Sequence, residues 1–323
     1  MTRIAALDPA SYRRHLIHGE NRAWAETNCY SDVVIELLHG LGHEPIAALP
    51  FTLTQDFELD QWTFFKFPDS DLLDLYGFDI QELAVWRPLA EHVATQIAAG
   101  RPVLVELDSF FLPDTAGTAY KLAHVKSTVA VNEIDVAERR LGYFHNQAYH
   151  SLEGDDFADL FQLDGLVHER MLPPYIEFVK MRPGYPLNQK ALLDGSLELL
   201  KKHVTRIPAN NPFVAFKSHF ERDLAWLGDA GIENFHAYSF ATLRQYGACF
   251  ELAETYVRWL GECGIGGLEQ TVESLKNISE TAKALQFQLA RSIARKRPMD
   301  LSPLDATAGW WDSATMDLRS RYG

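Results

Sequence analysis

A change of pattern about halfway along the chain most limits the folds available to it. Before about Gly154, short β-branched runs alternate with amphipathic helical segments and polar turns. From Asn188 onward, apolar residues recur at three- and four-residue spacing, which predicts helices over residues 188–204, 212–227, 235–260 and 268–295. We therefore expect an α+β protein with a mixed domain over residues 1–160 and an all-helical domain over residues 161–323, the boundary lying between Gly154 and Pro174.

Charge and cysteine content narrow the possible partners. The 323 residues include 30 basic and 44 acidic side chains, and the net charge of -14 disfavours binding to nucleic acid or to an anionic membrane. No apolar run approaches a membrane span, and three scattered cysteines predict neither a disulfide framework nor a zinc motif. His39 and His43 are four residues apart, but Gly40 and Gly42 interrupt the helix between them. We expect a cytoplasmic protein with no metal and no bound cofactor.

Cys29 stands where a helix is predicted to begin. Apolar residues from Tyr30 to Leu41 share one face, and Gly40 and Gly42 end the pattern. A cysteine on a first helical turn meets unpaired backbone N–H groups and the positive end of the helix dipole, both of which favour a thiolate. Cys29 is therefore a candidate nucleophile, and the alternative is a small apolar residue that simply packs at this position.

Three short runs predict strands. The first is β-branched and covers residues 103–107, the second alternates from His124 to residue 131, and the third covers residues 141–144 after a polar turn over 132–139. A hairpin centred on Asp135 places His124 opposite Asn146. Side chains directly opposite on antiparallel strands lie about 5 Å apart at Cβ, within reach of a hydrogen bond.

The order of these residues indicates a particular chemistry. A cysteine at a helix start, a histidine that opens a strand and a carboxamide at the end of the next strand follow one another as in papain-like cysteine enzymes. The thiol needs a base to become a thiolate, and the base needs a third group that fixes its tautomer. We therefore assign Cys29 as nucleophile, His124 as base and Asn146 as the orienting residue, with His145 and Asp135 as alternatives if the register differs.

Three segments give a resemblance to known proteins: GENRAWAETNCYSDVVIELLHGLGHEP, GRPVLVELDSFFLPD and LAHVKSTVAVNEID. They resemble the papain-like carrier-protein acyltransferases of butirosin biosynthesis, and the chain is grouped with domain-of-unknown-function family 1839. The resemblance covers roughly residues 20–150. It implies a papain-like catalytic domain over residues 1–160, a catalytic set of Cys29, His124 and Asn146, and Asp108 beside the pocket. Relatives often carry Asp where this chain has Asn146.

The resemblance also implies a reaction. An acyl group, which can be an aminoacyl group, passes from the phosphopantetheine arm of an acyl or aminoacyl carrier protein through Cys29 to a small-molecule amine acceptor. The backbone N–H of Cys29 is one expected oxyanion donor, and Asn28, Gln55, Gln61 or Trp62 is the second. A basic cluster on this acidic chain, Arg291, Arg295, Lys296 and Arg297, is an expected docking point for an acidic carrier or a set of cations at a helix end.

Two alternatives stay open at the level of sequence. A cysteine amidase or peptidase uses the same three residues with water as acceptor. A noncatalytic binding protein on a papain-like scaffold keeps Cys29 as an ordinary thiol.

Overall fold

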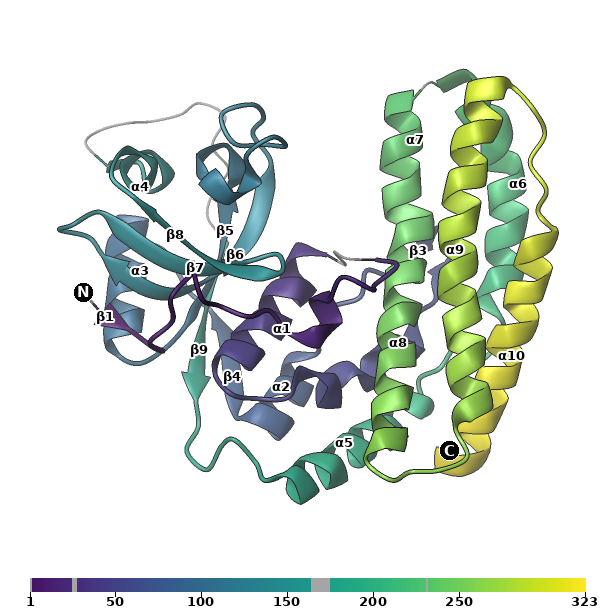
Figure 1. Ribbon diagram of the computed structural model, residues 1–323, viewed down its shortest axis with the longest axis horizontal. Coiled ribbons are helices and arrows are strands. Elements are labelled where there is room, and N and C mark those ends of the chain that lie inside the picture. The colour runs from purple at the N-terminus through teal and green to yellow at the C-terminus, as the bar shows by residue number, and fades with distance from the viewer. Residues whose placement is uncertain (1, 25–27, 164–174, 231) are drawn as a thin grey trace. The chain divides into compact units, whose positions relative to one another are not determined.

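The computed structural model describes residues 2–24, 28–163, 175–230 and 232–323 (Figure 1). The chain divides into two compact units, which we call the sheet unit and the helical unit. The sheet unit comprises Met1–Gly19, Asn28–Pro45 and Pro68–Leu187, and the helical unit comprises Glu20–Thr27, Ile46–Phe67 and Asn188–Gly323.

This division differs from the predicted boundary at residues 160 and 161. Strand β9 (Ile176–Met181) pairs with both β4 (Phe78–Glu82) and β5 (Val103–Asp108), so the sheet needs the chain well beyond residue 161. Two early segments also belong to the helical unit. The predicted boundary region ending at Pro174 runs into residues 164–174, which lie outside the described residues.

A seven-stranded antiparallel sheet organises the sheet unit. The strand order is β4-β9-β5-β6-β7-β8, and β1 lies beside β6. Strand β5 confirms the predicted strand over residues 103–107 and ends one residue later. The other strands are β1 (Thr2–Arg3), β6 (Lys126–Asp135), β7 (Arg140–His145) and β8 (Ala148–Glu153).

Helices cover both faces of this sheet. Helix α1 (Cys29–Gly40) lies on one face, where Gly40 leaves room for a ring of β7: a Cβ at this position would lie 2.5 Å from Phe144 Cζ. On the other face, apolar residues of α3 (Leu89–Ala98) and α4 (Asp155–Leu160) pack against inward-facing residues of β5, β6 and β7 (Figure 1). Helix α2 (Asp69–Tyr76) precedes β4. The predicted helix beginning at Cys29 is confirmed.

The helical unit is built mainly from long helices, as the sequence predicts. The predicted helix over residues 235–260 is divided: α7 (Ile232–Ser239) passes through a π-helical turn, Phe240–Arg244, into α8 (Gln245–Glu262). Two short strands, β2 (Phe57–Glu58) and β3 (Gln61–Trp62), also belong to this unit. Its other helices are α5 (Gln189–Val204), α6 (Pro212–Ala230), α9 (Glu269–Arg295) and α10 (Ser302–Tyr322).

Candidate functional site

Cys29 is the first residue of α1, and the helix start is well defined. The Asn28 side chain accepts a hydrogen bond from the Ser31 backbone N–H at 2.9 Å, which caps the helix. The thiol is partly exposed and donates a long hydrogen bond, 3.8 Å, to the Thr128 hydroxyl of β6. Asn28 therefore acts as a helix cap, and the strand residue nearest the thiol is a threonine, which cannot act as a base near neutral pH.

His124 lies just before β6, and its partner is Asp108 at the end of β5. The distance from His124 Nδ1 to Asp108 Oδ2 is 2.6 Å, so the carboxylate fixes the imidazole with its Nδ1–H as donor. The other carboxylate oxygen of Asp108 accepts the Phe110 backbone N–H at 3.0 Å. The His124 ring also stacks on Phe110, with centroids 4.4 Å apart. Asp108 thus makes the contact with His124 that was predicted for Asn146.

The predicted pairing of His124 with Asn146 is wrong. The observed register sets Val129 opposite His145, and Asn146 lies in the tight turn between β7 and β8 with φ of 49°. The reason is that β6 continues to Asp135 instead of ending before residue 132. Asn132, which reads as a turn residue in the sequence, is fully buried in the strand and bonds the N-terminal segment through its carboxamide.

Cys29 and His124 approach the same face of the sheet without a direct bond. Thr128 contacts the thiol and is paired with Glu106, while Asp108, two residues further along β5, points to the same face as Glu106. Within the described parts of the chain, no hydrogen bond joins Cys29 to His124. Lys126, which is paired with Asp108, forms an ion pair 2.7 Å long with Glu106, which is paired with Thr128. This ion pair therefore links the two positions.

The alternative orienting residues are engaged elsewhere. His145 donates from Nδ1 to Asp114 Oδ2 at 2.5 Å, and its Nε2 accepts the Ser127 hydroxyl at 2.5 Å. The hydroxyl of Tyr143 donates to the second Asp114 oxygen. His145 and the bonds around Asp114 lower the pKa of this carboxyl, and they outweigh the opposing effect of burial. The sequence did not indicate this arrangement, because Asp114 lies in an irregular loop whose position depends on the fold.

His145 is only 1% exposed and Ser127 only 8%, so this Ser–His–Asp chain is an internal network. Asp135, the other alternative, is the last residue of β6 and is paired with Arg140 across the hairpin.

Trp62, an expected oxyanion donor, belongs to the helical unit. Its ring is 5% exposed and packs against Phe57, Phe213 and Tyr246. Gln55 uses its side-chain amide to bind the Thr63 backbone carbonyl in the same unit. Both side chains have roles in the packing of the helical unit, and a substrate-binding role for Trp62 stays a prediction.

Comparison with known families gives two matches that together cover most of the chain. The profile of the DUF1839 N-terminal domain matches residues 13–181, and that of the DUF1839 C-terminal domain matches residues 189–320. The chain belongs to the DUF1839 family. No curated protein matches it. The two matched DUF1839 regions meet between residues 181 and 189. The chain passes from the sheet unit to the helical unit for the last time in the same interval, after Leu187.

A pocket of about 310 Å³ in this DUF1839 chain lies beside Asp108, the partner of His124. Glu106, Asp108 and Lys126 line its polar side, and Leu89, Leu160 and Phe161 are among its apolar residues. This combination of an apolar wall with a few charged groups is typical of small-molecule sites. Within the described ranges, no group of three or more His, Cys, Asp or Glu is arranged to hold a metal ion, and no helix is long and apolar enough to cross a membrane.

Proposed function

We propose that this DUF1839 protein is a cysteine-dependent acyltransferase whose sheet unit is a papain-like catalytic domain. Cys29 takes an acyl or aminoacyl group from the phosphopantetheine thioester of a carrier protein and passes it to a small-molecule amine. The observation that carries the proposal is the His124–Asp108 pair, 2.6 Å long, next to the sheet face that Cys29 contacts. The carboxylate holds Nδ1, which leaves Nε2 for proton transfer.

In the proposed reaction, Cys29 is the nucleophile and His124 moves the protons. His124 Nε2 takes the proton of the Cys29 thiol, and the thiolate attacks the thioester carbonyl. The tetrahedral intermediate collapses to an acyl-enzyme as the C–S bond to the pantetheine breaks, and His124 returns the proton to the departing thiolate. The amine then attacks the acyl-enzyme, loses its proton to His124 and releases the Cys29 thiol. The backbone N–H of Cys29, at the start of α1, is the oxyanion donor that this geometry favours.

The proposal requires a movement of His124 toward the thiol. Its ring is held by Phe110 and Asp108, and the side chain is 28% exposed, so Nε2 is accessible while Nδ1 is fixed. Two strand residues span about 7 Å, which separates the Thr128 position from the Asp108–Lys126 position on the same face. This movement has to keep the Asp108–His124 hydrogen bond, because that bond orients the base.

The pocket beside Asp108 supports a small acyl group or acceptor as substrate. Its apolar residues fit an aliphatic chain, and Glu106, Asp108 and Lys126 give it a charged side for a polar group. A basic cluster lies at the end of α9 on the helical unit, and all four of its residues are exposed: Arg291, Arg295, Lys296 and Arg297. This exposure supports docking of an acidic carrier there.

The test begins with the thiol. Wild type, Cys29→Ala and His124→Ala proteins are alkylated with iodoacetamide over a pH series, and the labelled cysteine is mapped by mass spectrometry. We expect Cys29 to react at about pH 6, where a free thiol is almost wholly protonated, and His124→Ala to abolish this early reaction. Cys249 is an internal control, because complete burial raises the pKa of its thiol.

The second stage offers acetyl-pantetheine and alanyl-pantetheine. We expect a mass increase on Cys29 equal to the acyl group and its loss when an amine is added. Release of free acid without an amine identifies a hydrolase and contradicts the transfer step. Alkylation of Cys29 no faster than that of a free thiol contradicts catalysis and leaves a binding protein on the same scaffold.

A further inference from the structure

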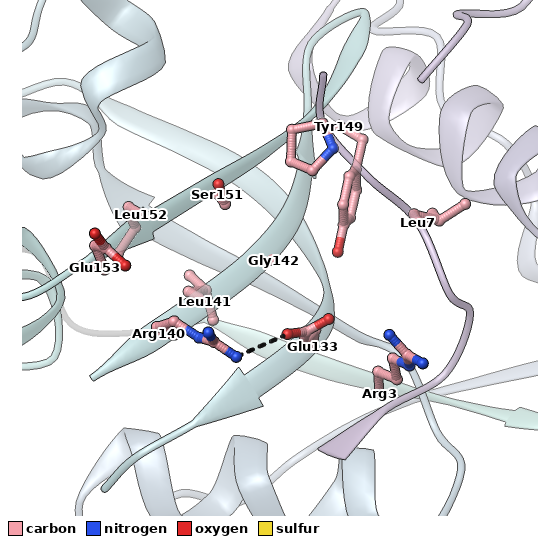
Figure 2. Close-up of a pocket in the computed structure, with 11 residues that line it drawn as sticks. Arg3, Leu7, Glu133, Arg140, Leu141, Gly142, Tyr149, Ser151, Leu152 and Glu153 are labelled. Carbon is pink, nitrogen blue, oxygen red and sulfur yellow. Dashed lines mark ion pairs between the residues drawn. The ribbon is translucent and has the colours of Figure 1, made fainter. Parts of the chain in front are cut away.

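A second pocket, of about 510 Å³, lies at the opposite end of β6, and one row of the sheet forms its floor. The register pairs Arg3 of β1 with Glu133 of β6, Glu133 with Gly142 of β7, and Gly142 with Ser151 of β8. Residues directly opposite one another on neighbouring strands point to the same face. These four positions therefore share one face, and all four line the pocket (Figure 2).

Gly142 makes room for the Tyr149 side chain in the middle of this row. A Cβ at this position would lie 2.2 Å from the Tyr149 hydroxyl oxygen, so any side chain would displace that group. The missing side chain lets the Tyr149 ring of β8 extend over the Gly142 position toward Glu133 (Figure 2). The hydroxyl of a buried residue is thereby presented to the pocket.

In the hydrogen bonds of the described residues, the Tyr149 hydroxyl acts only as an acceptor. Its oxygen accepts a hydrogen bond from Asn132 Nδ2 at 2.9 Å, and the other bonds of the Asn132 carboxamide go to the backbone of Ala5. Tyr149 is 3% exposed, and among the described residues its O–H has no acceptor. Burial raises the pKa of Tyr149, so the hydroxyl keeps this proton at neutral pH. A buried donor without an acceptor costs about 1–3 kcal/mol, which a bound acceptor removes.

The charges around the pocket leave one group of each sign without a partner. Arg140 lies 3.8 Å from Glu133, and this loose ion pair is drawn in Figure 2. Arg3 and Glu153 are both exposed, and within the part of the chain that the structure describes neither makes an ion pair. The pocket therefore combines a free guanidinium and a free hydroxyl donor with a free carboxylate.

We propose that this pocket binds a small zwitterion of the amino-acid class. Its carboxylate accepts hydrogen bonds from the Tyr149 hydroxyl and the Arg3 guanidinium, and its ammonium group faces Glu153 and Glu133. Guanidinium and carboxylate groups form strong charge-assisted bonds, and this supplies the anchor. The inference is independent of acyl transfer at Cys29, because none of the residues that line this pocket belongs to the catalytic set.

The experiment is a titration of the full-length protein with free amino acids, followed by ¹H–¹⁵N NMR and calorimetry. Acetate and methylammonium serve as half-ligands that carry only one of the two charges. We expect saturable binding of at least one amino acid, tighter than of either half-ligand, with amide shifts at Gly142 and Ser151. Tyr149→Phe keeps the ring and removes the proton, and we expect it to weaken binding about tenfold.

Arg3→Ala is expected to weaken binding by a similar factor, and Arg14→Ala, the same change at an exposed arginine outside the pocket, is the control. Glu153→Gln separates the ammonium contact, because it spares acetate binding and weakens amino-acid binding. No saturable binding of any amino acid up to about 10 mM overturns the proposal. Equal binding by wild type, Tyr149→Phe and Arg3→Ala also overturns it, since the ligand then lies elsewhere.

Discussion

Asp108 Oδ2 lies 2.6 Å from His124 Nδ1, at the two ends of the segment that joins β5 to β6. The bond fixes one nitrogen of the imidazole, and the His124 side chain is partly exposed. If His124 is the base for Cys29, its orienting group is therefore a carboxylate, which can also compensate the charge of an imidazolium. Asn146 can do neither from its turn between β7 and β8.

Asp108→Asn tests this assignment. The substitution keeps the acceptor for the Phe110 N–H but removes the charge beside His124. We expect acyl transfer from alanyl-pantetheine to fall by about 100-fold or more, in line with other losses of acid–base catalysis, and folding to be retained. Asn146→Gly is the matched control: φ of 49° suits glycine, so both activity and stability should stay near wild type. A loss of activity in Asn146→Gly with normal Asp108→Asn would restore the sequence-based assignment.

His18 provides a prediction on stability. It is fully buried between Asp32 and Glu36 of α1, with Nε2 3.2 Å from Asp32 and Nδ1 2.5 Å from Glu36. Burial alone would lower its pKa, but the hydrogen bonds and charges of the two carboxylates raise it to about 9. Because the folded pKa is raised, the stabilisation is complete below about pH 6.5 and is lost as the pH rises through about 9, a loss of roughly 3 kcal/mol.

The measurement is denaturant unfolding of wild type and His18→Gln over the same pH range. We expect the variant to lose about 3–5 kcal/mol at neutral pH, because two carboxylates stay buried without their cation, and to depend much less on pH. His236→Gln, an exposed change on α7, should leave the profile as in wild type. A wild-type profile that is flat between pH 6.5 and 9 would show that His18 is not charged in the folded protein.

The sequence predicted the elements of the sheet unit better than their register. The helix at Cys29 and the strand at 103–107 follow from periodicity, because each has one buried face or is buried throughout. Asn132 was predicted to lie in the turn of the hairpin, but it lies within β6. Its carboxamide forms hydrogen bonds with the backbone of Ala5, a residue far away in sequence. Sequence gives no sign of such a partner, so a buried asparagine reads as a turn.

The same limit applies to the site. Cys29 and His124 were chosen from the sequence because each opens a predicted element, and Asp108 because the resemblance implies a place beside the pocket. Their catalytic roles stay predictions. The segment from Pro113 to Ala123 has no strand or α-helical periodicity. The sequence therefore could not predict the hydrogen bond between Asp114 and His145. The burial of Trp62 could not be predicted from the polar stretch around it, because its neighbours Phe213 and Tyr246 come from much later in the chain.

Ser127→Ala tests whether the Ser127–His145–Asp114 network is structural. The change leaves His145 Nε2 buried without its donor, so we expect a loss of about 1–3 kcal/mol in unfolding free energy. Ser320→Ala, at an exposed hydroxyl of α10, should cost no more than about 0.5 kcal/mol. We expect no labelling of Ser127 by a fluorophosphonate probe. Labelling at Ser127 would mean that this serine is a nucleophile.

Two glycines of α8 provide a matched pair for the packing of the helical unit. Gly247 is buried, and a Cβ there would lie 2.5 Å from Trp24 Cζ2 and 2.8 Å from Ala282 Cβ. Trp24 cannot easily move away, because its Nε1 donates to Ser279 Oγ at 3.0 Å. Gly261 lies in the last turn of the same helix, and a Cβ there meets nothing within 4 Å.

Alanine has the higher helix propensity at both positions, so only packing separates the two variants. We expect Gly247→Ala to lower the unfolding free energy by about 1–3 kcal/mol through overpacking, and Gly261→Ala to leave it unchanged or raise it by up to about 1 kcal/mol. Denaturant unfolding at one pH measures both. If Gly247→Ala were as stable as Gly261→Ala, the Trp24 ring would have room to move away from α8 despite its hydrogen bond to Ser279 of α9.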